Sequence, residues 1–165
     1  MTPARPPSET FSSVDAAWLH MDSPTNLAVI TGVMSFPEPL DFGRLQRTIE
    51  SRLLPFARFR QRVRPSALSL GLPRWEADPD FDIHYHLQRT RLAEPGDQVG
   101  LQELVGDMMS LPLDPGRPLW QLYYVENVAG GSALVARLHH CIADGIALLQ
   151  VILSLTDDNP EALEP

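Results

Sequence analysis

Proline residues divide this chain into short segments, and this division constrains its folding more than any other sequence feature. There are 16 prolines, and they lie between stretches of periodic hydrophobicity rather than inside them. Because proline lacks a backbone N–H and has a fixed φ, it ends helices and interrupts strands. The prolines therefore mark the boundaries between the expected elements.

The first part of the chain predicts a strand, a helix and two shorter strands. Residues 27–36, rich in Val, Ile, Thr and Met, predict a strand. A helix should follow, with Asp41 as its N-cap and Pro55 as its stop, because apolar residues recur there at helical spacing. Residues 58–64 and 72–76 predict short strands around a loop.

Residues 81–88 alternate between apolar and polar side chains. The apolar members are Phe81, Ile83, Tyr85 and Leu87, and the polar members are Asp82, His84, His86 and Gln88. A period of two is typical of a strand with one buried and one solvated face. The two histidines would share the polar face, where they could hold a metal ion, although a simple solvated face is the favoured interpretation.

The second part of the chain predicts a helix, a hairpin and a final helix. The first helix follows Asp97 and ends near Pro112. Residues 120–127 and 132–139 predict two strands joined by a turn with the sequence Ala-Gly-Gly. Residues 146–155 predict a helix that is apolar on most sides and is therefore expected to be buried.

This order of elements predicts an α/β or α+β layered domain with a mixed β-sheet and packed helices. The domain is expected to cover residues 11–157, between a flexible N-terminus at residues 1–10 and an acidic, linker-like tail at residues 158–165. The 165 residues are enough for one domain of ordinary size or for half of a larger catalytic unit.

The composition excludes several functions. With 13 basic and 21 acidic residues the formal net charge is −8, and no basic stripe is present, so nucleic-acid binding is not expected. Every basic residue is an arginine, which leaves no lysine for Schiff-base chemistry. The single cysteine, Cys141, excludes an internal disulfide and a cysteine-built zinc site. With no visible secretory signal and no apolar run of membrane-spanning length, a cytoplasmic protein is expected.

The most distinctive side chains lie near the end of the predicted hairpin. His139 and His140 end a predicted strand, and Asp144 and Gly145 precede a predicted helix. Such a junction lies at the rim of a sheet, where ligands commonly bind in α/β folds. Alternation places His140 on an apolar strand face and His139 on the face of an arginine. A partly desolvated imidazole favours its neutral form, so His140 is the candidate general base.

Structural explanations compete with each of these assignments. Asp144 is the type of residue that caps a following helix, and Gly145 permits close packing. An isolated buried histidine such as His140 is more often a hydrogen-bonded core residue than a catalytic one. Joint metal binding by His139, His140 and Asp144 is not expected, because adjacent strand residues point to opposite faces. Cys141 is interpreted as a small buried hydrophobe rather than a nucleophile.

The pattern H-H-x-x-x-D-G, from His139 to Gly145, resembles the active-site motif of the CoA-dependent acyltransferase superfamily. That group includes chloramphenicol acetyltransferase and peptide-synthetase condensation domains. Three other stretches resemble its bacterial wax ester synthase/diacylglycerol acyltransferases: residues 13–18 with 24–26, residues 59–63 with 75–86, and residues 112–114 with Arg117-Pro118-Leu119-Trp120. The resemblance covers about residues 12–159.

The resemblance implies transfer of a fatty acyl group from acyl-CoA to the hydroxyl of a long-chain alcohol or a diacylglycerol. His140 would be the general base and His139 a supporting residue, while Asp144 and Gly145 would hold the loop. The substrate-binding wall beneath the site would be formed by Pro118, Leu119 and Trp120. Acyl-CoA would be a co-substrate, and neither a cofactor nor a metal ion is implied.

The same resemblance implies one half of a two-domain fold like that of chloramphenicol acetyltransferase, in which the acyl-CoA tunnel runs between the halves. This sequence matches only the first half. A separate C-terminal half or self-association is therefore expected to complete the site, and lipid substrates imply peripheral contact with the inner membrane or lipid inclusions. Two alternatives remain open, a non-catalytic acyl-binding or association module and a condensation-type acyltransferase.

Overall fold

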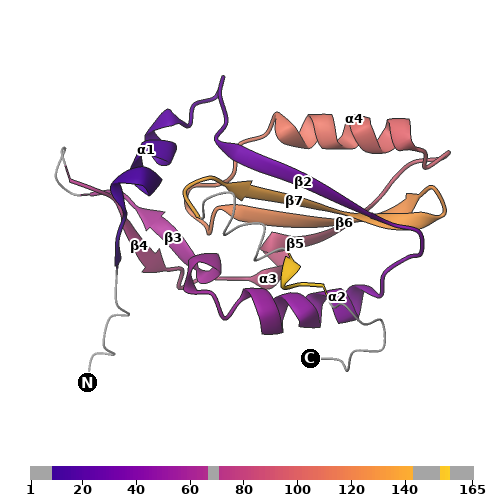
Figure 1. Cartoon of the computed structure of the whole chain (residues 1–165), viewed down its shortest axis with the longest axis horizontal. Helices are drawn as coiled ribbons and strands as arrows, with labels where there is room; N and C mark the ends of the chain where they lie inside the picture. The colour runs from indigo at the N-terminus through magenta and orange to yellow at the C-terminus, as the bar shows by residue number, and fades with distance from the viewer. Residues whose placement is uncertain (1–8, 67–70, 143–152, 157–165) are drawn as a thin grey trace.

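A mixed four-stranded sheet forms the centre of the computed structural model, which describes residues 9–66, 71–142 and 153–156 (Figure 1). In spatial order its strands are β2 (Val29–Phe36), β7 (Gly131–His139), β6 (Trp120–Val128) and β5 (Leu87–Arg91). β7 is antiparallel to both of its neighbours, and β5 runs parallel to β6. The predicted α/β class with a mixed sheet is confirmed.

The hairpin of β6 and β7 forms where the sequence predicts it. The turn between the strands contains Ala129 and Gly130, which have positive φ angles of 49° and 85°. Gly131 then begins β7, and an added Cβ there would lie 2.1 Å from the carbonyl oxygen of Phe36 on β2. Glycine is therefore required at residue 131 by the close approach of two backbones.

Helices cover both faces of this sheet (Figure 1). α4 (Gln98–Met109) packs Leu101 and Met108 against Val135 of β7. On the opposite face, α2 (Phe42–Thr48) and the π-helical turn η1 (Ile49–Leu53) pack against the alternate residues of β7. The side chains of Asp41 and Asp97 cap α2 and α4 by accepting backbone N–H groups at 2.6 and 2.9 Å. Both helices were predicted with these starts.

A second, smaller sheet lies beside α1 (Ser13–Met21) (Figure 1). Its strand order is β1 (Glu9–Thr10), β4 (Arg74–Ala77) and β3 (Gln61–Arg64), all antiparallel, and the single turn η2 (Ala57–Arg60) precedes β3. The two short strands expected around residues 58–76 are therefore present and paired. Residues 9 and 10 form β1, although the sequence places them in a flexible end.

The strand predicted from the alternation of residues 81–88 is wrong over residues 81–86. The short helix α3 (Ile83–His86) occupies this position, and β5 begins only at Leu87. The side chain of Asp82 accepts the N–H of His84 at 2.9 Å and so favours a helical turn. His86, expected on a solvated face, is fully buried instead.

The expected helix at residues 146–155 lies largely outside the described residues. Within the described ranges, no helix is long and apolar enough to cross a membrane.

Candidate functional site

The histidine pair lies at the end of β7, where the chain turns away from the sheet. The carbonyl of His139 accepts the N–H of Ile142 at 3.0 Å, which closes a tight turn. Within this turn the Nδ1 atom of His139 accepts the N–H of Cys141 at 3.1 Å. The N–H of His140 donates to the carbonyl of Ala28, just before β2, at 2.9 Å. The alternation of side chains between the two faces ends with β7 at His139. Beyond it, these three hydrogen bonds fix the backbone of the turn and therefore the position of His140.

The His139 side chain is buried beside a cavity. Only 2% of the residue is exposed, and it lines a cavity of about 360 Å³ with walls that are mainly leucine and proline. Its Nε2 atom lies 3.8 Å from Oδ2 of Asp22 at the end of α1. Burial lowers the pKa of His139, an effect that Asp22 opposes and His140 reinforces. The ring is therefore neutral near pH 7.

The His140 side chain has different neighbours. Its ring is half-buried and stacks on the indole of Trp18 from α1, with ring centroids 4.2 Å apart and an interplanar angle of 14°. Its Nδ1 atom is buried and has no hydrogen-bond partner among the described residues. The buried Nδ1 is closed to substrate, so a half-buried ring held by stacking can accept a proton only on its exposed side, from a substrate group that reaches it there.

The Pro118-Leu119-Trp120 segment lies directly beside the histidine turn. The carbonyl of Leu119 accepts the N–H of His139 at 3.0 Å, and Leu119 lines the same cavity. Trp120 pairs with Leu138 in the sheet but points into the core. Its indole N–H donates to the carbonyl of Phe59 at 2.9 Å.

His86 packs against Trp120 and holds its backbone. The two rings stack at 4.5 Å, and the Nδ1–H of His86 donates to the carbonyl of Trp120 at 2.8 Å. Burial lowers the pKa of His86, so it too is neutral. The chain before Trp120 is held at Arg117, whose guanidinium lies 3.5 Å from the buried carboxylate of Asp78 and donates to the carbonyl of Asp80.

Cys141 has the structural character expected from the sequence. It is fully buried, and burial together with the charge of Asp15 raises its pKa to about 12. Its thiol is therefore protonated at neutral pH and is not an activated nucleophile. Among the described residues, no cluster of three or more metal-ligating side chains is present. Asp144 and Gly145 lie outside the described residues.

Sequence reasoning missed two residues of this site. The sequence marks Trp18 only as part of a segment that resembles the family, and no sequence feature singles out Asp22. They are separated by one helical turn at the end of α1, and that spacing shows that they share a side of the helix. The sequence held no sign that this side faces the histidines, because the contact joins segments about 120 residues apart.

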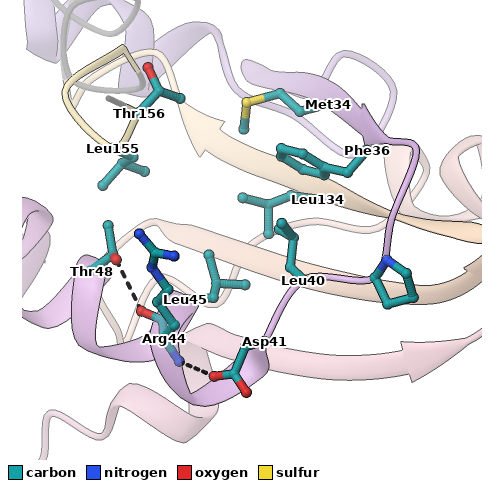
Figure 2. Close-up of a pocket in the computed structure, with 11 residues that line it drawn as sticks. Met34, Phe36, Leu40, Asp41, Arg44, Leu45, Thr48, Leu134, Leu155 and Thr156 are labelled. Atoms are coloured by element: carbon teal, nitrogen blue, oxygen red, sulfur yellow. Dashed lines mark hydrogen bonds between the residues drawn. The ribbon is translucent and has the colours of Figure 1, made fainter. Parts of the chain in front are cut away.

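A second cavity of about 380 Å³ lies between α2 and the strands β2 and β7, and none of its lining residues belongs to the histidine turn (Figure 2). Met34, Phe36 and Leu134 form its sheet side. Arg44 of α2 is the cation among the lining residues. This cavity is separate from the His139 cavity in its lining and in its place on the sheet.

Comparison with known proteins identifies the family. The wax ester synthase/diacylglycerol acyltransferase catalytic domain matches residues 11–165. The chain belongs to this family. A probable diacylglycerol O-acyltransferase of Mycobacterium tuberculosis strain H37Rv is 38% identical over 154 residues, which are 90% of this chain and 33% of that protein. A second probable diacylglycerol O-acyltransferase of the same strain is 33% identical over 145 residues, which are 86% of this chain and 54% of that protein.

Solved structures support the same fold. The wax ester synthase/diacylglycerol acyltransferase of Marinobacter aquaeolei VT8 superposes with a TM-score of 0.77 at 24% identity, over 93% of this chain and 38% of that one. The starter condensation domain of rhizomide synthetase gives a TM-score of 0.72 at 15% identity, over 90% of this chain and 38% of that one. The resemblance seen in the sequence is therefore confirmed. The chain spans about a third of the length of the curated relatives it matches first.

Proposed function

We propose that this chain carries the histidine side of an acyltransferase site that moves a fatty acyl group from acyl-CoA to the hydroxyl of a long-chain alcohol or a diacylglycerol. The observation that carries the proposal is the pair His139 and His140 at the end of β7, which stands in the family motif at the rim of the sheet, with His139 lining a cavity of about 360 Å³. That volume lies in the range of small-molecule pockets, about 300–1,000 Å³.

In the proposed reaction His140 acts as the general base. Its imidazole takes the proton of the acceptor hydroxyl as that oxygen attacks the thioester carbonyl carbon. The tetrahedral intermediate then collapses, the carbon–sulfur bond breaks, and the imidazolium returns the proton to the departing CoA thiolate. Ester and free CoA are the products, and atoms and charge balance without a cofactor or metal ion.

The neighbouring residues have supporting roles in this proposal. His139 holds the turn through its Nδ1 atom and does not contact the acceptor oxygen. Leu119 forms part of the apolar cavity wall, while its buried neighbours, Pro118 before β6 and Trp120 at the start of β6, support that wall. The role proposed for Asp144 and Gly145, which is to hold the loop after the turn, rests on the family motif alone.

The proposal includes a second unit that completes the site. Residues 11–157 would form the N-terminal acyltransferase domain, and the opposing wall of the substrate tunnel would come from a C-terminal unit like that of the relatives or from a second copy of this chain. Lipid acceptors favour a cytoplasmic enzyme in peripheral contact with the inner membrane or with lipid inclusions.

Product analysis tests the reaction class. The purified chain is incubated with palmitoyl-CoA and hexadecanol or dipalmitoylglycerol over a range of protein concentrations, and CoA and ester are quantified by thiol titration and mass spectrometry. We expect ester in amounts equal to the CoA released, with a specific rate that rises with concentration if a second copy completes the site. Hexadecane, which has the chain but no hydroxyl, is the matched control.

The outcomes separate the alternatives. Equal CoA release with hexadecane and hexadecanol would identify a hydrolase and contradict the proposal. Saturable binding of palmitoyl-CoA without ester, at any protein concentration and also with the C-terminal unit of a relative added, would contradict it and would favour a non-catalytic acyl-binding module.

A further inference from the structure

The carboxylate of Asp22 lies between the backbone N–H of Ala28 and the ring of His139. Asp22 is the C-cap residue of α1. Its Oδ1 atom accepts the N–H of Ala28 at 2.7 Å, and its Oδ2 atom lies 3.8 Å from Nε2 of His139. The carbonyl of Ala28 in turn accepts the N–H of His140 at 2.9 Å. One side chain therefore contacts the residue that anchors His140 and the ring beside it.

The hydrogen bonds of the turn require one tautomer of His139. Because Nδ1 accepts the N–H of Cys141, this atom carries a lone pair, and the proton of the neutral ring must lie on Nε2. Nε2 is buried, and Asp22 is the acceptor group that faces it. The opposite tautomer would place two N–H groups against each other in the turn and would turn a lone pair toward a carboxylate.

We propose that Asp22 is a positioning residue, which fixes the tautomer of His139 and the place of Ala28 and thereby holds the turn that carries His140. The catalytic consequence rests on the proposed function, whereas the structural part stands on these contacts alone. The titratable groups that act on His139 are Asp22 at the end of α1 and His140 in the turn.

Nitrogen NMR tests the structural part. The protein contains five histidines, and the ring signals of His139 are assigned in ¹⁵N-histidine-labelled protein by comparison with His139→Gln. We expect the Nε2–H tautomer of His139 in the wild type at pH 7.5. Asp22→Asn keeps an oxygen for the N–H of Ala28 but removes the charge, so the pKa of His139 should fall below its wild-type value.

Asp22→Ala removes both contacts. We expect mixed tautomers at His139 and changed amide signals at Ala28 and His140. Asp107→Asn, the same charge change at an exposed residue of α4, is the matched control and should leave these signals unchanged. Circular dichroism establishes that each variant is folded, and if Asp22→Ala does not fold, the tautomer and pKa in Asp22→Asn decide. Two results together would overturn the inference. The tautomer and pKa of His139 would be unchanged in Asp22→Asn, and the amide signals of Ala28 and His140 would be unchanged in Asp22→Ala if that variant folds.

Activity provides the second readout. A misplaced general base loses rate, so kcat for ester formation should fall by ~10–100-fold in Asp22→Ala with a smaller change in KM. A kcat equal to that of the wild type would refute the catalytic part. If the wild type forms no ester even with the C-terminal unit of a relative added, the proposed function fails, but the NMR signals still decide whether Asp22 holds the turn.

Discussion

Two buried tryptophans provide a matched pair for testing how the segment beside the histidines is held. Trp120 and Trp75 are both fully buried. The indole N–H of Trp120 donates to the carbonyl of Phe59 at 2.9 Å, whereas the indole N–H of Trp75 has no partner among the described residues. Replacing either by phenylalanine removes the same ring atoms, but only Trp120→Phe also removes a hydrogen bond.

The expected cost follows from these contacts. Removing ring atoms from a close-packed core costs about 1–2 kcal/mol in either variant. Trp120→Phe additionally leaves the buried carbonyl of Phe59 without its donor, which costs about 1–3 kcal/mol. Trp75→Phe removes a buried N–H that has no described partner and so loses no such bond. The free energy of unfolding should therefore fall by at least ~1 kcal/mol more in Trp120→Phe than in Trp75→Phe.

Urea denaturation followed by circular dichroism measures this difference, provided that the slope with denaturant is the same in both variants. For a chain of 165 residues, each kcal/mol corresponds to roughly 2–4 °C in Tm. Trp120→Phe should thus melt several degrees below Trp75→Phe. A Trp75→Phe variant that is equally or more destabilised would refute the reasoning that the indole hydrogen bond anchors this segment.

Three further predictions concern single elements. Gly131→Ala should lower Tm more than Gly130→Ala does. A Cβ at residue 131 would lie 2.1 Å from a backbone oxygen, whereas a Cβ at residue 130 would enter open space and meet only the strain of a φ of 85°. Equal Tm values in the two variants would contradict this. Asp97→Ala should cost about 1 kcal/mol in urea denaturation by removing the N-cap of α4. The free energy of unfolding should fall as the pH is lowered from 7.5 to 5.5. Burial lowers the pKa of His86 and His139 in the folded protein, whereas histidines of the unfolded chain titrate near pH 6.5, so the unfolded chain binds more protons in this range. His86→Phe should flatten this dependence, and a Tm that rises toward pH 5.5 would contradict the assignment of both rings as neutral.

Local signals in the sequence were sufficient for much of the fold. Asp41 and Asp97 predict the starts of α2 and α4 because an N-cap acts within three residues of itself. The hairpin of β6 and β7 is also local, since its turn joins adjacent strands. The mixed sheet follows from the order of these elements.

The sequence predictions were wrong where contacts between residues far apart in the chain determine the local structure. Residues 81–88 alternate like a strand, but a single helical turn is too short for its own period to appear in the sequence. His86 is buried because Phe81 and Trp120 lie on either side of its ring at 5.1 and 4.5 Å. No pattern within residues 81–88 shows that Trp120, 34 residues away, will cover this ring.

The candidate site also has one part that the sequence predicts and one part that depends on distant contacts. The histidine pair was visible as a motif, and its position at the end of a predicted strand gave its place at the sheet rim. The stacking of Trp18 on His140 and the approach of Asp22 to His139 depend on how α1 packs against the end of β7. That packing is a property of the folded chain and not of any one segment.

The most direct test of the account is the rate of ester formation in His140→Ala beside His84→Ala. His84 is exposed on α3 and has no role in the proposed site, so the two variants differ only in which histidine is lost. We expect His84→Ala to retain the wild-type rate of hexadecanol-dependent CoA release from palmitoyl-CoA and His140→Ala to lose a factor of ~10²–10⁴. A His140→Ala variant that is folded and as active as His84→Ala would show that acyl transfer does not occur at this histidine.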